Sequence, residues 1–170
     1  MLEYLIVGLI ILFLIIVTLF FIKLHSLKDI LNILELAKEK TRVFLNKKKE
    51  TLDKIMEKIN DNNFTKNIDL KEDDTIFNID DILYKKRNLL ISFLEEKKEI
   101  NEEQKILLKD LSFIEENIDG LKDFYNKQVY TYNESLSKKP FSFLFPLFKL
   151  KKLKPWNINK LIEYTILKKD

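Results

Sequence analysis

The 170-residue chain contains no cysteine and only one histidine, and both absences exclude particular kinds of site. Without cysteine there are no disulfides, no thiolate catalysis and no cysteine-based zinc site. With one histidine, neither a histidine-based metal cluster nor the paired Glu-x-x-His motifs of a di-iron bundle can form within the chain. We therefore expect no metal site and no cofactor.

Glycine and proline, the usual breakers of helices, are also scarce. The two glycines are at positions 8 and 120, and all three prolines follow residue 139. The long middle of the chain thus contains almost nothing that would interrupt a helix, which favours long helices.

Arginine accounts for only two of the 30 cationic residues, and the formal net charge is +3. Arginine is the side chain that best recognises guanine edges and stacks on bases. A weak positive charge carried almost entirely by lysine argues against nucleic acid as a partner.

The most apolar stretch is the uncharged run from Tyr4 to Ile22. As a helix, its 19 residues would span about 28 Å, close to the hydrocarbon thickness of a bilayer. A cleaved signal peptide is disfavoured because the run exceeds the usual 7–15 residues, no lysine or arginine precedes it, and no A-x-A pattern follows it. Residues 1–23 are therefore predicted to be an uncleaved single-pass anchor in the cell membrane.

The charges that flank this run predict its orientation. Glu3 is the only charged side chain before it, whereas Lys23, Lys28 and Lys38 follow it. Because cations accumulate on the cytoplasmic side, we expect the N-terminus outside and the C-terminal domain in the cytoplasm. His25, at the membrane boundary, is interpreted as an interfacial residue.

Residues 24–170 are predicted to form one helical domain. Apolar residues at three- and four-residue steps indicate helices at about 24–59, 75–99 and 101–138, and a short C-terminal helix at about 157–168. The first has no reason to break from the anchor and is expected to continue it as one rod. The crowding of Asn and Asp over residues 60–74 indicates a loop. Asn101 and Gln104 have the spacing of a helix-capping pair.

No single apolar stripe can be buried without partners. The predicted fold class is therefore all-α: an N-terminal transmembrane helix followed by an antiparallel bundle of three to four long helices.

The end of the third predicted helix carries a motif. Residues 125–133 have the pattern YNxxVxxYN, and Pro140 follows its second Asn by seven residues. Upstream, Leu107, Leu111, Glu115, Ile118 and Lys122 also match, and residues 146–151 resemble a GLFGFK segment. On these residues the chain resembles the LemA family, most firmly over about residues 107–151. The motif positions are Glu115, Tyr125, Asn126, Val129, Tyr132, Asn133, Pro140 and Phe148.

The chain departs from that family at several points. Lys139 precedes Pro140 where the family has Phe, Lys149 replaces a Gly, and the Pro and Asn of the family's first helical segment are absent. The resemblance implies a membrane-anchored antiparallel helical bundle without an established biochemical activity, and it supplies no catalytic residue. The motif tyrosines are expected to fill the core and the motif asparagines to bond the returning C-terminal segment.

Two groups of charged residues allow both a structural and a functional interpretation. The acidic cluster Glu95, Glu96, Glu99, Glu102 and Glu103 alternates with lysines, which favours a solvated helix face over a divalent-cation site. The segment 138–156 is basic and aromatic, so it either docks on anionic lipid or caps the bundle. Packing is favoured because the segment coincides with the family motif. The candidate lipid contacts are Lys149, Lys151, Lys152, Lys154 and Trp156.

The sequence thus predicts a non-enzymatic interaction or scaffolding module attached to the membrane. The alternative is a lipid-binding or membrane-remodelling protein that uses the anchor together with segment 138–156. The expected partners are the lipid bilayer and unidentified proteins, and self-association is compatible with either function.

Overall fold

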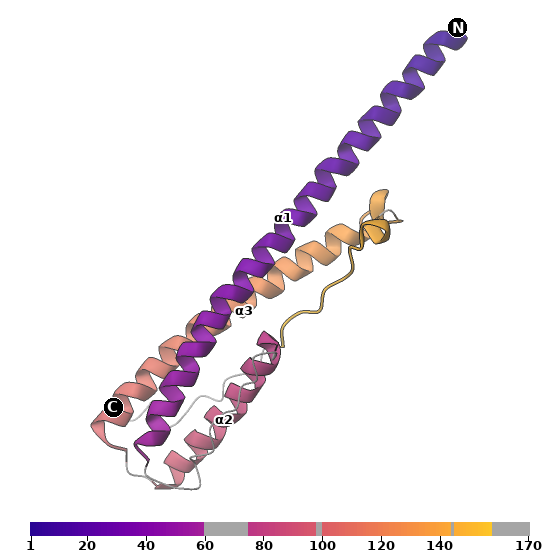
Figure 1. Cartoon of the computed structure of the whole chain (residues 1–170). Coiled ribbons are helices and arrows are strands. Elements are labelled where there is room, and N and C mark those ends of the chain that lie inside the picture. The colour runs from indigo at the N-terminus through magenta and orange to yellow at the C-terminus, as the bar shows by residue number, and fades with distance from the viewer. Residues whose placement is uncertain (60–74, 98–99, 144, 158–170) are drawn as a thin grey trace. The chain divides into compact units, whose positions relative to one another are not determined.

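The computed structural model describes residues 1–59, 75–97, 100–143 and 145–157, and all regular structure within these ranges is helical. The elements are α1 (Leu2–Glu57), α2 (Ile76–Lys97), α3 (Glu102–Ser137) and two short 3₁₀ helices, η1 (Phe141–Phe143) and η2 (Phe145–Phe148) (Figure 1). The all-α prediction is confirmed. The loop expected at 60–74 and the helix expected at 157–168 lie outside the described residues, apart from Asn157.

Helix α1 contains 56 residues and is continuous, as expected from the lack of a break after the apolar run. At 1.5 Å per residue it is about 84 Å long. Its N-terminal part is exposed on nearly every face up to Leu19, and Phe20 is the first buried residue. Within the described ranges, α1 is the one helix with the length and composition to span a membrane, a property it shares with signal sequences.

Helix α3 begins with the predicted capping box. The backbone N–H of Gln104 donates to Asn101 Oδ1 at 2.8 Å, and the backbone N–H of Asn101 donates to Gln104 Oε1 at 3.0 Å. Two N–H groups that the first helical turn leaves without partners are thereby satisfied.

The chain forms two compact units, to which α1 and α3 both contribute. The first combines Met1–Leu36 with Tyr125–Pro155. Its core joins α1, the end of α3 and η2, and consists of Phe20, Leu24, Leu27, Tyr132, Leu136 and Phe145.

The second unit comprises Ala37–Phe124 and Trp156–Asp170, and here the three helices each bury one stripe. Its most deeply buried apolar side chains are Leu45, Leu52, Ile55, Leu83, Leu90, Leu94, Leu111 and Ile118. Leu108, rather than the Leu107 of the predicted stripe, is buried at the start of α3.

Helix directions in the second unit follow from its ion pairs. Lys48 of α1 pairs with Glu115 of α3, and Lys58, the residue after the end of α1, pairs with Glu103 of α3, so α1 and α3 are antiparallel. Asp80 and Arg87 of α2 pair with Lys122 and Glu115, so α2 and α3 are antiparallel too.

Helices α1 and α2 therefore run parallel to each other, so the predicted antiparallel packing holds for α1 with α3 and for α2 with α3 but not for α1 with α2 (Figure 1). Short connections favour antiparallel neighbours, but the connection between α1 and α2 is long. The 18 residues between α1 and α2 can extend to roughly 60 Å, whereas α2 with 22 residues is about 33 Å long. The connection is therefore long enough to return along the full length of α2, so that α2 can begin in the same direction as α1.

Candidate functional site

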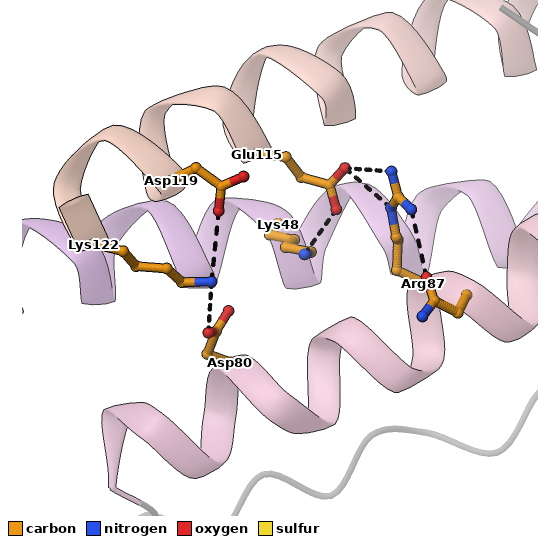
Figure 2. A network of polar contacts seen from close by, with 7 residues as sticks. Lys48, Asp80, Arg87, Glu115, Asp119 and Lys122 are labelled. Atoms are coloured by element: carbon orange, nitrogen blue, oxygen red, sulfur yellow. Dashed lines mark hydrogen bonds and ion pairs between the residues drawn. The ribbon is translucent and has the colours of Figure 1, made fainter. Parts of the chain in front are cut away.

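The interior of the second unit holds a network of charged side chains centred on Glu115 of α3 (Figure 2). Arg87 of α2 donates from Nε to Glu115 Oε2 at 3.0 Å, and its Nη2 lies 2.8 Å from the same oxygen. Lys48 of α1 places its Nζ 2.8 Å from Oε1. All three residues are at most 5% exposed, so one carboxylate connects three helices in a region that excludes water.

The two oxygens of Glu115 are held differently. Oε2 accepts a charge-assisted hydrogen bond from the guanidinium Nε, the stronger type of contact. Oε1 has the Lys48 ammonium at 2.8 Å but no hydrogen bond of acceptable geometry, so that contact is electrostatic.

A second ion pair lies two helical turns away. Lys122 Nζ is 2.7 Å from Asp80 Oδ2 and 3.7 Å from Asp119 Oδ1 (Figure 2). The indole Nε1–H of Trp156 donates to the same Asp80 oxygen at 3.1 Å. Asp80 Oδ1 is buried and has no hydrogen-bond partner among the described residues.

The network is electrically balanced. Lys48, Arg87 and Lys122 face Asp80, Glu115 and Asp119. Burial raises the pKa of the half-buried Asp119 carboxyl, and the nearby Lys122 charge opposes that rise. An ammonium or guanidinium already occupies the position beside each deeply buried carboxylate where a cation would bind.

The network contains no hydroxyl, thiol or imidazole to act as a nucleophile. Within the described ranges, no group of three or more His, Cys, Asp or Glu residues is placed to hold a metal ion. Because each buried charge has one complementary position, the network favours one axial register of α2 against α3.

The spacing within the network makes this register specific. Asp80 and Arg87 are seven residues apart on α2, and Glu115 and Lys122 are seven apart on α3. Since the two helices are antiparallel, acid meets base at both levels. A slip of seven residues would place Arg87 opposite Lys122, where like charges would repel in a medium of low dielectric constant.

The motif at the end of α3 lies in the first unit. Tyr125, Val129 and Tyr132 are at most 3% exposed, and burial raises the pKa of the Tyr132 hydroxyl. Asn133 bonds the returning segment through both polar atoms of its amide, as the sequence analysis expected of the motif asparagines. Asn126 is half-buried.

The segment after α3 packs back on α1. A cis peptide bond joins Lys139 to the exposed Pro140. The Phe145 ring, 1% exposed, stacks on Phe20 with a centroid distance of 6.1 Å, and the Phe148 ring lies 5.4 Å from Phe20.

Helix η2 ends in a Schellman motif. Lys149 has a φ of 57°, its N–H donates to the Pro146 carbonyl at 3.0 Å, and the Leu150 N–H donates to the Phe145 carbonyl at 3.2 Å. This left-handed position normally favours Gly, and it is one of the positions at which the chain departs from the GLFGFK pattern.

The candidate lipid contacts separate into two groups. Lys149, Lys151, Lys152 and Lys154 are exposed, as lipid contact requires. Trp156 is not: it is 4% exposed, belongs to the second unit and packs edge-on against Phe77 at 4.6 Å. Because its side chain is buried, Trp156 is a packing residue and not a lipid contact.

Of the acidic cluster, the exposed members are Glu95, Glu96, Glu102 and Glu103, whereas Glu99 lies outside the described residues. Glu102 is paired with Lys105 at 2.7 Å, and this contact lowers the pKa of the Glu102 carboxyl. His25 is exposed, with Nε2 3.7 Å from Asp29 of the next turn.

Sequence reasoning missed Lys48, Asp80 and Arg87, although a signal for them exists. Asp80 and Arg87 occupy positions of the α2 stripe formed by Ile76, Leu83 and Leu90, and Lys48 falls between Leu45 and Leu52 on the α1 stripe. Charged residues at core positions of three separate stripes indicate buried pairing. Comparisons with protein-family models, curated proteins and solved structures gave no match for this chain.

Proposed function

We propose that this protein is a membrane-anchored helical bundle of the LemA type that works as a non-enzymatic interaction or scaffolding module. In this proposal the apolar run of α1 crosses the cell membrane with the N-terminus outside, and the helical body lies at the cytoplasmic face. The observation that carries the proposal is the continuity of α1, which joins an exposed apolar run of membrane-spanning length to a packed bundle.

The absence of an enzymatic role is supported by the chemistry of the interior. The buried charged side chains neutralise one another across helices, which is the arrangement of a framework rather than of a reactive site. The LemA resemblance is supported by the Asn133 bonds to the returning segment and by the left-handed backbone at Lys149.

A scaffold also needs surface for partners. Ile106, Phe113 and Phe124 are 60%, 65% and 43% exposed. Their spacings of seven and eleven residues place them on one face of α3, and exposed apolar side chains that share a face are typical of protein contacts.

Membrane extraction tests the anchoring. Membranes from cells that produce the full chain are washed with alkaline carbonate, and the pellet is compared with that of a Leu12→Lys, Ile15→Lys variant. The chain is expected to stay in the pellet until detergent is added, and the variant to be released. Release of the unaltered chain by carbonate would refute the anchor.

Photocrosslinking in intact membranes tests the scaffolding role. A benzophenone amino acid at Phe113 is compared with one at Lys109, an exposed position one turn away. Discrete protein adducts are expected at Phe113 in greater yield than at Lys109. Equal diffuse labelling at both positions would argue against a protein-binding surface on this face.

Membrane remodelling is the second candidate. It is favoured by the exposed Lys149, Lys151, Lys152 and Lys154, which follow one another closely in the first unit. Electron microscopy of anionic liposomes that contain the full chain would separate the two functions. Tubules or ordered arrays would support remodelling, whereas undeformed vesicles would support scaffolding.

A further inference from the structure

Helix η2 contacts the apolar run of α1 itself. Phe20, against which both Phe145 and Phe148 pack, is inside the run from Tyr4 to Ile22. All of these residues belong to the first unit. The position of Phe20 in a bilayer would therefore determine the depth of η2.

That depth follows from helix geometry. Phe13 is the middle residue of the run, and Phe20 is seven residues further on, or about 10 Å along the helix axis. The hydrocarbon core of a bilayer extends about 15 Å from its centre. If the run is centred in the bilayer, Phe20 is inside the hydrocarbon, and rings in contact with Phe20 lie at the membrane boundary.

The outer side of this element is apolar. Phe143 is 72% exposed, Leu147 is 77% exposed and Phe148 is 45% exposed. Large apolar side chains gathered within six residues, on an element that touches a membrane-spanning run, have the character of an interfacial anchor.

The charges around the element are complementary to lipid head groups. Exposed lysines stand on both sides of it: Lys139 precedes η1, and Lys149, Lys151 and Lys152 follow η2. No acidic residue occurs from Lys138 to Asn157. Lysines beside an apolar anchor are attracted to the anionic lipids of the cytoplasmic leaflet.

We propose that η1 and η2 form a second membrane contact, in which Phe143 and Leu147 insert into the leaflet that holds the C-terminal end of the anchor. Lys149, Lys151 and Lys152 then lie at the level of the lipid phosphates. The proposal rests on the membrane anchoring proposed above. Its consequence is that the first unit meets the membrane at two points, α1 and η2, so its rotation about the α1 axis is restricted.

Depth-dependent fluorescence quenching tests this contact in the full chain. Because the chain has no cysteine, single sites can be labelled with the environment-sensitive dye NBD. The test site is Leu147→Cys. Leu12→Cys lies in the middle of the run, so a dye there shows whether the run is in the bilayer. Lys127→Cys is exposed on α3 in the same unit and gives the fluorescence of a dye in water. Each protein is reconstituted into anionic liposomes with lipids spin-labelled at shallow or deep positions.

The proposal predicts that NBD at Leu147→Cys is several-fold brighter than at Lys127→Cys and is quenched most strongly by the shallow spin label. Leu12→Cys should be quenched most strongly by the deep label. If Leu12→Cys is quenched while Leu147→Cys behaves like Lys127→Cys, the second contact is refuted and the anchor stands. If neither is quenched, the anchoring and the second contact both fail.

Lipid charge tests the role of the lysines. In neutral vesicles, quenching at Leu147→Cys should fall while quenching at Leu12→Cys stays the same. The variant Lys151→Glu, Lys152→Glu, labelled at Leu147→Cys, should show the same fall in anionic vesicles. Quenching independent of lipid charge would refute the head-group contact.

Discussion

Asn133 of α3 and Leu153 exchange two hydrogen bonds across 20 residues of chain. The Asn133 amide donates from Nδ2 to the Leu153 carbonyl at 2.8 Å, and its Oδ1 accepts the Leu153 N–H at 2.9 Å. One side chain thereby satisfies both backbone groups of a residue that is in neither a helix nor a strand. This contact holds the segment after η2 against α3.

Replacing Asn133 by Ala should lower the free energy of unfolding by about 2 kcal/mol, because two partly buried backbone groups lose their partners. Thermal unfolding of the full chain in detergent, followed by circular dichroism, measures the change. Thr131→Ala is the matched control, since the Thr131 hydroxyl is exposed and bonds only a carbonyl of its own helix. A melting temperature as high as that of the control would show that the Asn133 bonds do not stabilise the segment.

Replacing Glu115 by Gln should be more severe, at about 3–5 kcal/mol, because Arg87 and Lys48 would be left as uncompensated buried charges. Denaturant unfolding in detergent measures the loss. The adjacent Glu116 is exposed, so Glu116→Gln should change the free energy of unfolding by less than about 0.5 kcal/mol. Equal effects of the two variants would contradict the proposed role of the network.

The Asp80–Lys122 pair should show energetic coupling. Asp80→Asn and Lys122→Met each remove one partner of a buried pair, whereas the double variant removes both charges together. The double variant should therefore lose about 1–3 kcal/mol less stability than the sum of the single losses. Strict additivity would mean that the two side chains do not stabilise each other.

Lys149→Gly should stabilise the protein by about 0.5–1 kcal/mol, because a φ of 57° strains a residue with a Cβ but not glycine. The gain is partial, since glycine also increases the entropy of the unfolded chain. Lys151→Gly is the control: Lys151 is likewise exposed and has no left-handed backbone, so its replacement should be neutral or destabilising. A loss of stability at position 149 would show that the strain is compensated elsewhere.

Stability should fall at alkaline pH through Tyr132. Burial raises the pKa of this hydroxyl above its ordinary value of 10.0, so the unfolded chain loses the proton first as the pH rises. The contribution of Tyr132 is complete below pH 10.0 and is lost as the pH rises through its folded-state pKa. The free energy of unfolding, measured from pH 8 to 11, should fall less in Tyr132→Phe than in Tyr130→Phe. Tyr130 is the control because its side chain is 73% exposed.

Features encoded over short distances were predictable from the sequence. The apolar run, the continuity of α1 and the Asn101–Gln104 cap all depend on residues within a few turns of one another. The bonding of Asn133 to the returning C-terminal segment was expected as well, as the structural role of the motif asparagines.

Features that depend on distant parts of the chain were not predictable in this way. The parallel direction of α1 and α2 arises because both helices pair with α3 in the antiparallel sense. The long connection between α1 and α2 permits either direction, so the local sequence does not decide it. Lys48, Asp80 and Arg87 were missed because a charged residue was assumed to be solvated, although their positions on the stripes require burial. The burial of Trp156 depends on Phe77 and Asp80, nearly 80 residues earlier in the chain.

Site-directed labelling of the two sides of the membrane tests the central claim most directly. Leu2→Cys and Lys127→Cys, each in the full chain, are treated in intact and in permeabilised cells with a maleimide that does not cross membranes. The account predicts labelling of Leu2→Cys in intact cells and of Lys127→Cys only after permeabilisation. Labelling of Lys127→Cys in intact cells, or recovery of either protein in the soluble fraction, would contradict a cytoplasmic bundle anchored by α1.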